Sequence, residues 1–308
     1  MKKISAWLNA ARLRTLPLSV SGILVGTALA SAYGYTDAKI FILALLTTIG
    51  FQVTSNFAND YGDGIKGTDR DDRLGPKRAF QSGILSEKEL KRGIYLSIGI
   101  NIALVMLLVY VSFGVKELVL PVIFLCLGLL AIWAAIKYTV GTSAYGYNGL
   151  GDVFVFIFFG LVSVLGSMFL YTKMVTLSSL LPAITIGLLS VGVLNLNNLR
   201  DHRSDKLVGK NTLVVKMGFE NGKRYHYSLL IISFFCLFSY LVTTNGSLVR
   251  YLCLIGYLPI GIHVRKVALV ESARELDPEL KKLALSTFLT ALLFYIIYYY
   301  FVILSVTF

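Results

Sequence analysis

Residues 40–64 of the chain read IFILALLTTIGFQVTSNFANDYGDG, an apolar run that passes directly into a cluster of amides and acids. The apolar part belongs to a segment at 39–58, and about 20 residues is the length that an α-helix needs to cross a bilayer. Polar groups at membrane depth are costly and usually face the interior of a helix bundle or a water-filled cavity. The stretch therefore predicts a membrane-spanning helix with a functional site at one end.

The composition of the whole chain agrees with a membrane protein. Of its 308 residues, 56% are hydrophobic and 15% are charged, whereas a soluble domain carries about 25% charged residues. The apolar segments of near-membrane length lie at about 16–34, 39–58, 94–113, 118–137, 151–171, 177–197, 227–244, 248–264 and 284–306. The sequence therefore predicts an all-α integral membrane protein of about nine transmembrane helices. No linker or low-complexity tract interrupts it, so we expect a single domain over residues 1–308.

The basic residues are distributed unevenly between the predicted loops. The N-terminus and the loops that follow the even-numbered segments contain 25 of the 29 lysines and arginines. By the positive-inside rule these parts are cytoplasmic, and an odd number of spans then places the C-terminus outside. The net charge of +12 reflects topology in the plasma (inner) membrane, and nucleic-acid binding is not indicated. No continuous apolar stretch precedes Pro17, so we expect no cleavable signal peptide.

A second polar cluster repeats the first. The second and the sixth apolar segments each end in three polar residues spaced i, i+3 and i+7, 142 residues apart: Asn56, Asn59 and Asp63, then Asn198, Asp201 and Asp205. On a helix this spacing keeps the three side chains on one face. Both segments end on the same side of the membrane. The simplest interpretation is a four-helix unit used twice, plus a ninth helix, with both clusters facing one central cavity.

The residue types of the two clusters suit a Mg²⁺ and diphosphate site. Carboxylate and amide oxygens without His or Cys favour hard cations such as Mg²⁺, which often bridge to substrate phosphates. Basic side chains that can bind phosphate oxygens follow both clusters. They are Lys66, Arg70, Arg73, Lys77 and Arg78 after the first cluster, and Arg200, Arg203, Lys206 and Lys210 within or after the second. One such cluster alone would more often be a solvated helix end, but two at matched helical phase favour a site.

The motifs resemble those of a known family. NFANDYGDGIKGTDRDDRLGPKRAF (56–80) and LNLNNLRDHRSDKLVGKNTLVVKMG (194–218) are similar to the paired aspartate-rich motifs of the UbiA-type membrane prenyltransferases. ARLRTLPLSVSGILVGTALA (11–30) and YGYNGLGDVFVFIFFG (145–160) are similar to the branch of that family in the menaquinone pathway. The resemblance covers about residues 6–220.

The resemblance implies an activity and its partners. It implies Mg²⁺-dependent transfer of a polyprenyl group from polyprenyl diphosphate to an aromatic acid, in the lipid bilayer and without an obligate protein partner. In the menaquinone branch the acceptor is 1,4-dihydroxy-2-naphthoate, which loses CO₂ in the reaction. The other acceptors of the family, 4-hydroxybenzoate, homogentisate and chlorophyllide, remain alternatives.

The resemblance also assigns roles to residues. The metal-binding positions of the family fall on Asn59, Asp60, Asp63, Asn198, Asp201 and Asp205, and its diphosphate positions on Asn56, Lys66, Lys77, Arg78 and Lys210. Tyrosine faces can stabilise an allylic cation by about 0.5–2 kcal/mol each. We expect Tyr138, Tyr145 and Tyr147 in this role because they lie in a cytoplasmic loop.

The acceptor side depends on further residues. Arg12 and Arg14 could bind the acceptor carboxylate or could serve topology alone. Asp152 could orient or deprotonate an acceptor hydroxyl, or could be an acid favoured at a helix N-terminus. The loop before Asp152 departs from the family pattern, with Lys137 in place of an uncharged residue and Ser143 and Ala144 in place of a basic residue and a proline.

Two other classes of membrane protein fit the sequence less well. The DYGDG at 60–64 opens like the signature of the CDP-alcohol phosphotransferases, but the Ala-Arg expected shortly afterwards is missing. A cation-coupled transporter would hold its acidic site near the midplane of the membrane, whereas these acids gather at one end of the spans.

Overall fold

The chain folds entirely from helices. A computed structural model describes residues 2–67, 78–115, 117–244 and 247–301, and within these ranges there is no β-strand. Nine helical segments of this described part are long and apolar enough to cross a membrane. The predictions of an all-α membrane protein and of nine spans are thereby confirmed.

The elements follow in chain order, with the η elements being 3₁₀-helical except for the π-helical η3 and η6. They are α1 (Lys2–Ala11), η1 (Leu13–Thr15), α2 (Leu16–Ala32), α3 (Ala38–Ile65), α4 (Glu87–Phe113), α5 (Val119–Lys137), η2 (Tyr145–Tyr147), α6 (Gly151–Val155), η3 (Phe156–Gly166), α7 (Ser167–Thr172), α8 (Leu180–Leu207), α9 (Leu213–Met217), α10 (Phe219–Thr243), η4 (Leu248–Tyr257), α11 (Leu258–Leu269), η5 (Ala273–Leu276), α12 (Asp277–Ile296) and η6 (Ile297–Phe301).

The second and sixth spans are longer at one end than their apolar segments. α3 continues to Ile65, past the predicted end at 58, and α8 continues to Leu207, past 197. A helix satisfies its own backbone hydrogen bonds, so it can carry polar side chains beyond the apolar run without unpaired backbone groups. Each polar cluster therefore lies on continuous helix, as its spacing predicts.

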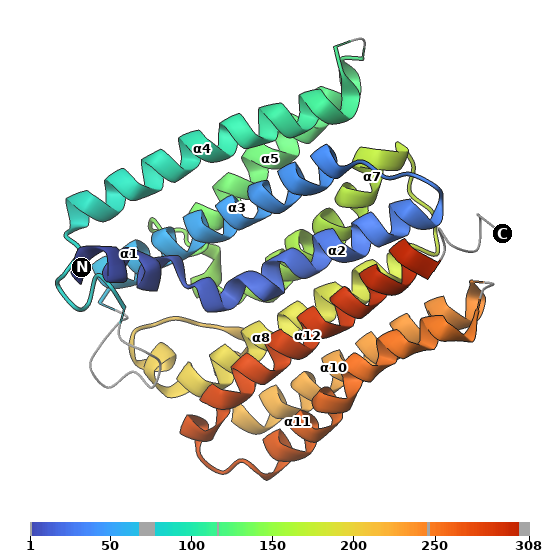
Figure 1. Ribbon diagram of the computed structural model, residues 1–308. Helices are drawn as coiled ribbons and strands as arrows, with labels where there is room; N and C mark the ends of the chain where they lie inside the picture. The colour runs from blue at the N-terminus through green and yellow to red at the C-terminus, as the bar shows by residue number, and fades with distance from the viewer. Residues whose placement is uncertain (1, 68–77, 116, 245–246, 302–308) are drawn as a thin grey trace.

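The long helices run side by side across the molecule (Figure 1). α3 packs against α2, α4 and α5, and α8 packs against η3 and α10. α12 contacts both α2 and α8. The ninth span thus joins the first half of the chain to the second.

Small residues bring the helices around the centre close together. A Cβ atom at Gly22 of α2 would lie 2.6 Å from the Ser163 Cβ of η3, and one at Gly160 of η3 would lie 2.6 Å from the Gly187 Cα of α8. Small residues at such contacts let membrane helices approach closely, since lipid supplies no hydrophobic force between them. They fix η3 between α2 and α8.

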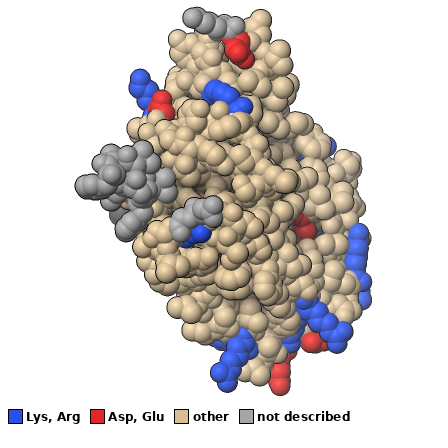
Figure 2. Space-filling view, turned by 90° about the vertical axis from the view of Figure 1, so that its right-hand side faces the viewer, with Lys and Arg blue, Asp and Glu red and all other residues tan. Residues whose placement is uncertain are grey.

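The end of the molecule opposite α1 carries few charges. Figure 2 views the molecule from this side, and most of the visible face has neither basic nor acidic side chains.

Large apolar side chains such as Tyr95, Met106, Ile231 and Phe235 are exposed on the flanks of α4 and α10. Such exposure suits a surface in contact with lipid, and it agrees with a multi-pass membrane protein.

Candidate active site

A cavity of about 780 Å³ runs through the middle of the helix bundle. Side chains of α2, α3, α4, α5, η3, α8 and α12 line it. Its polar end contains Asp60, Asp63, Arg78 and Lys210, and its other walls are largely apolar, with Phe124 among them. A volume of this size is typical of sites that enclose a small molecule.

The first acidic cluster is buried and held by cations. Arg78 Nη1 donates to Asp63 Oδ2 at 2.6 Å and to the carbonyl oxygen of Asn59 at 3.1 Å. Asp60 accepts from Arg12 Nη2 at 3.2 Å and from the backbone N–H of Ala79 at 3.1 Å. Both carboxylates are almost fully buried, and buried charges need such partners.

Arg12 reaches Asp60 from an unusual backbone conformation. Its φ of 49° and ψ of 55° place it in the left-handed region, which is costly for a residue other than glycine and is kept only where the surrounding structure holds it. Asn56 supplies part of this hold, because its Nδ2 donates to the Ala11 carbonyl oxygen at 2.9 Å and to Thr15 Oγ1 at 3.3 Å. In this structure Asn56 thus ties α3 to the N-terminal segment, and diphosphate binding by Asn56 stays a prediction.

The second acidic cluster is organised by Arg200. Its Nε and Nη2 donate to the two carboxylate oxygens of Asp201 at 2.8 and 2.7 Å, and its Nη1 donates to Asp277 Oδ1 at 2.6 Å. Lys210 Nζ lies 3.6 Å from Asp205 Oδ1. Arg200, Asp277 and Lys210 line the cavity. Asn198, Asp201 and Asp205 are buried and are not among the described residues of its lining.

Tyr147 links the two clusters. Its hydroxyl donates to Asp63 Oδ1 at 2.8 Å, and the ammonium groups of Lys66 and Lys210 lie 3.9 and 5.5 Å from the centre of its ring. Burial and the neighbouring Lys210 lower the pKa of Lys66, and Asp63 opposes this effect. Two ammonium groups over one ring repel each other, and a bound anion would relieve that repulsion.

An aromatic wall stands beside the clusters. The Tyr138 and Tyr145 rings meet edge to face with centres 5.4 Å apart, and Tyr145 stacks on Phe154 at 3.9 Å. All three line the cavity. Burial raises the pKa of the Tyr138 and Tyr145 phenols, and nearby carboxylates raise that of Tyr138 further. Both phenols therefore stay neutral beside the cavity that they line.

The remaining predicted residues are distributed around the site. Arg14 is exposed and lines the cavity, whereas Asp152 is buried, does not line it and accepts from the Tyr225 hydroxyl at 3.2 Å. Lys77 lies outside the described residues. In the preceding loop, Ser143 is exposed and Ala144 is buried.

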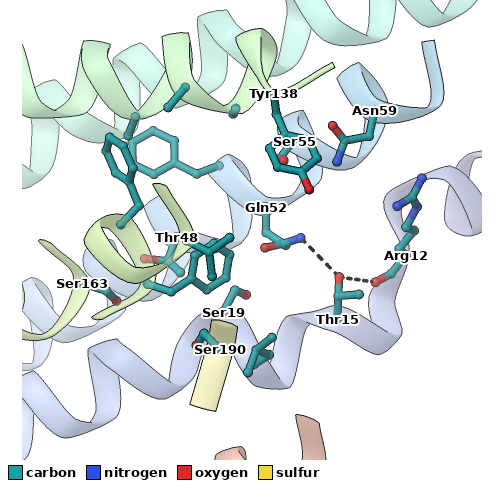
Figure 3. Close-up of a pocket in the computed structure, with 18 of the residues that line it drawn as sticks. Arg12, Thr15, Ser19, Thr48, Gln52, Ser55, Asn59, Tyr138, Ser163 and Ser190 are labelled. Atoms are coloured by element: carbon teal, nitrogen blue, oxygen red, sulfur yellow. Dashed lines mark hydrogen bonds between the residues drawn. The ribbon is translucent and has the colours of Figure 1, made fainter. Parts of the chain in front are cut away.

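Several residues of the cavity wall were not predicted from the sequence. Thr48, Gln52 and Ser55 of α3 line the cavity and point into it (Figure 3). They continue the spacing of Asn59 and Asp63 toward the middle of the membrane, so helical phase alone would have found them. Asp277 and Lys281 had no such signal, because they lie at the start of the ninth span, far from both motifs.

The residues fit a hard divalent cation. In the described part of the chain, no three His, Cys, Asp or Glu side chains lie together as a group that could hold a metal ion without further ligands. The buried donors that the two clusters offer are carboxylate and amide oxygens, which are the ligands that Mg²⁺ prefers. The cations around them suit the phosphate oxygens that such an ion usually bridges.

Comparison with known proteins identifies the class. Residues 19–278 match the model of the UbiA prenyltransferase family. The chain belongs to this family. Among solved structures it is similar to a UbiA homolog from Archaeoglobus fulgidus bound to GPP and Mg²⁺, with a TM-score of 0.69, 16% identity, and coverage of 97% of this chain and 99% of that one.

Two proteins of the family are similar to the chain over nearly its whole length. The chain is 42% identical to the 1,4-dihydroxy-2-naphthoate octaprenyltransferase of Escherichia coli, over 96% of this chain and 95% of that protein. It is 31% identical to the protein of the same name from Mycobacterium tuberculosis, over 95% of this chain and 96% of that protein.

Proposed function

We propose that the protein transfers a polyprenyl group from polyprenyl diphosphate to 1,4-dihydroxy-2-naphthoate, releasing diphosphate and CO₂ and giving demethylmenaquinol, the reduced form of demethylmenaquinone. The observation that carries the proposal is the 42% identity, over nearly the whole of both chains, to a protein named for this substrate. The cavity supports it, since one end is charged and the other walls are largely apolar.

Mg²⁺ is the proposed cofactor. Asn59, Asp60 and Asp63 on α3, and Asn198, Asp201 and Asp205 on α8, would hold it. A solved relative binds GPP and Mg²⁺. When bound, the ion neutralises charge on the diphosphate and makes it a better leaving group.

The basic side chains are proposed to bind and orient the diphosphate. Arg78 is fixed by Asp63 and by the Asn59 carbonyl oxygen, so its guanidinium keeps one position at the cavity wall. Lys66 and Lys210 both lie close to the Tyr147 ring and share a site for an anion. Arg14 is free to meet the acceptor carboxylate from the exposed side of the cavity.

The proposed reaction has three steps: loss of the diphosphate, formation of a C–C bond and loss of CO₂. The allylic C–O bond breaks and its electron pair leaves with the diphosphate, and the faces of Tyr138 and Tyr145 stabilise the positive charge that develops. The ring carbon that carries the carboxylate forms the new C–C bond. The bond to the carboxylate then breaks, CO₂ leaves, and its electron pair restores the aromatic ring.

The proposed orientation places this site on the cytoplasmic side. The N-terminus and the loops after the even-numbered spans carry most of the basic residues. α1, both acidic clusters and the loop that contains Tyr147 lie at the corresponding end of the bundle (Figure 1). The C-terminus would then be outside.

One assay tests the proposal. Purified protein receives Mg²⁺, a long polyprenyl diphosphate and dihydroxynaphthoate labelled at its carboxylate, and we expect release of labelled CO₂ with formation of a prenylated product. EDTA should abolish both. Asp63→Ala and Asp201→Ala should each lower turnover by about 100-fold or more and still insert into the membrane.

The outcomes separate the levels of the proposal. Prenylation of 4-hydroxybenzoate, and never of dihydroxynaphthoate, would show that the acceptor is wrong. The absence of Mg²⁺-dependent diphosphate release with any acceptor would reject the reaction class. Full activity of either alanine variant would reject the assignment of the metal site.

A further inference from the structure

The second acidic cluster contains a contact that its motif does not predict. Arg200 is 3% exposed and lines the cavity, and its guanidinium bonds to Asp201 on its own helix and to Asp277 on α12. Its Nη2 also donates to Asn197 Oδ1 at 2.7 Å. The guanidinium therefore lies between two carboxylates that belong to different spans.

Asp277 is more than an acid at a helix start. It is the first residue of α12, where the helix dipole favours a negative charge, but its 2.6 Å contact with Arg200 Nη1 is a short, charge-assisted hydrogen bond. The Arg200 side chain is nearly buried, whereas that of Asp277 is 43% exposed. Asp277 thus brings a counter-charge from the cavity rim to a buried cation.

The contact between Asp277 and Arg200 matters for the balance of charge around Asp201. In the structure both carboxylate oxygens of Asp201 accept from Arg200. A divalent cation that binds Asp201 must compete with the guanidinium for these oxygens. A buried guanidinium that loses its only carboxylate partner strongly destabilises a protein. When the cation takes Asp201, Arg200 still has Asp277 and Asn197 as partners.

We propose that Asp277 is a positioning residue of the second acidic cluster: it holds the Arg200 guanidinium at the cavity wall when a divalent cation takes the Asp201 carboxylate. This inference rests on the proposed metal site. It assigns the ninth span a part in the site, although that span carries neither aspartate-rich motif.

Metal binding without substrates provides the test. Mn²⁺ takes the same oxygen ligands as Mg²⁺, and its binding to the purified protein can be followed by electron paramagnetic resonance. Asp277→Asn keeps the size of the side chain and removes its charge, and we expect Mn²⁺ to bind about tenfold more weakly. Asp277→Glu should restore most of the affinity. Glu271→Gln is a matched control, since Glu271 is an exposed acid six residues away, and it should bind Mn²⁺ like wild type.

A double-mutant cycle isolates the mechanism. In an Arg200→Met background the competing cation is gone, so adding Asp277→Asn should change Mn²⁺ affinity less than twofold. Arg200→Gln serves the same purpose if the methionine variant does not fold. Wild-type affinity in Asp277→Asn would overturn the inference, and so would an equal loss in the presence and absence of Arg200.

The same experiment separates this inference from the proposed function. Wild-type protein that binds Mn²⁺ at a site lost in Asp201→Ala, yet does not prenylate dihydroxynaphthoate, would contradict only the proposed function. Wild-type protein with no such Mn²⁺ site would overturn both.

Discussion

At the scale of single residues, Tyr147 has the most specific position in the site. It comes from the loop between the fourth and fifth spans, and its hydroxyl reaches Asp63 on the second span. Its ring lies beneath Lys66, and Lys210 of the second half of the chain approaches the same ring. One side chain thus contacts parts of the site that come from three regions of the sequence.

Replacing Tyr147 by Phe should separate the contribution of the hydroxyl to activity from that of the ring. The variant keeps the face beneath the two lysines and loses the hydrogen bond to the Asp63 carboxylate. A hydrogen bond to a charged group contributes about 1.5 kcal/mol or more, so we expect kcat/KM to fall roughly tenfold. Steady-state kinetics with a polyprenyl diphosphate measures the effect.

Tyr61→Phe is the matched control for this change. Tyr61 lies on α3 between Asp60 and Asp63, but its hydroxyl lies 3.5 Å from Glu87 at the exposed edge of the bundle. We expect the activity of the Tyr61→Phe variant to stay within about twofold of wild type, as is usual when the group removed lies at the surface. Equal losses in the two variants would show that the Tyr147 hydroxyl has no specific role.

At the scale of elements, the contact between α2 and η3 shapes the cavity. Gly22 and Gly26 of α2 face η3: a Cβ at Gly22 would lie 2.6 Å from the Ser163 Cβ, and one at Gly26 would meet the Val164 carbonyl oxygen of η3 and lie 2.7 Å from the Ser167 Cβ of α7. η3 carries Phe158, Phe159 and other residues of the cavity wall. A displacement of η3 would therefore change the cavity as well as the packing.

Gly26→Ala should destabilise the protein by about 1–3 kcal/mol, because the added methyl group has no space. Gly99→Ala is the control, since Gly99 lies on α4 with no atom within 4 Å of an added Cβ. Removing that glycine should be neutral or stabilising by up to about 1 kcal/mol. Thermal unfolding in detergent compares the two, and equal melting temperatures would contradict the packing argument.

A buried polar chain joins the last three spans. His226 Nε2 of α10 lies 2.9 Å from His263 Nε2 of α11, and His263 Nδ1 lies 2.8 Å from Glu279 Oε2 of α12. All three side chains are at most 1% exposed. With the Nδ1 proton donated to the carboxylate, His263 Nε2 accepts from His226. The chain fixes how the three helices pack.

His263→Ala should therefore cost about 1–3 kcal/mol, because it leaves His226 and one carboxylate oxygen of Glu279 without their buried partner, while Lys266 and Lys282 still neutralise the carboxylate. Lys266→Ala removes a contact of 3.2 Å to the same carboxylate from a side chain that is 48% exposed, and it should cost less than about 1 kcal/mol. Thermal unfolding of both variants measures the difference. A loss for Lys266→Ala as large as that for His263→Ala would contradict the assignment.

At the scale of the whole molecule, two loop positions distinguish the two possible orientations in the membrane. Ser143 and Leu177 are exposed in successive loops that belong to opposite ends of the bundle. By the positive-inside rule, Ser143 is cytoplasmic and Leu177 is outside. The two positions therefore report the orientation directly.

Cysteine labelling makes this comparison. The three native cysteines are first replaced by alanine, and a membrane-impermeant maleimide is then applied to intact cells. Leu177→Cys should react at once, and Ser143→Cys should react only after the membrane is opened. The reverse pattern would show that the predicted orientation is wrong.

Much of the fold follows from local properties of the sequence. Apolar segments of membrane length identify all nine spans of the described chain, because a helix must satisfy its backbone groups internally in lipid. The i, i+3, i+7 spacing identifies the helix faces that carry the two polar clusters, since that spacing depends only on helical geometry. Apolar run length missed the ends of α3 and α8, because a helix continues wherever the protein shields its polar side chains.

The partners of the site residues were decided by tertiary structure. No periodicity relates Tyr147 to Asp63 or Asp277 to Arg200, because these contacts join spans that are far apart in the chain. The left-handed backbone at Arg12 is likewise held by Asn56, from α3. The sequence by itself determined the number of spans, the positions of the acidic clusters and the family, since these depend on run length, spacing and motif. Only the packing of the spans decided which cation neutralises each buried acid, since that depends on which helices become neighbours.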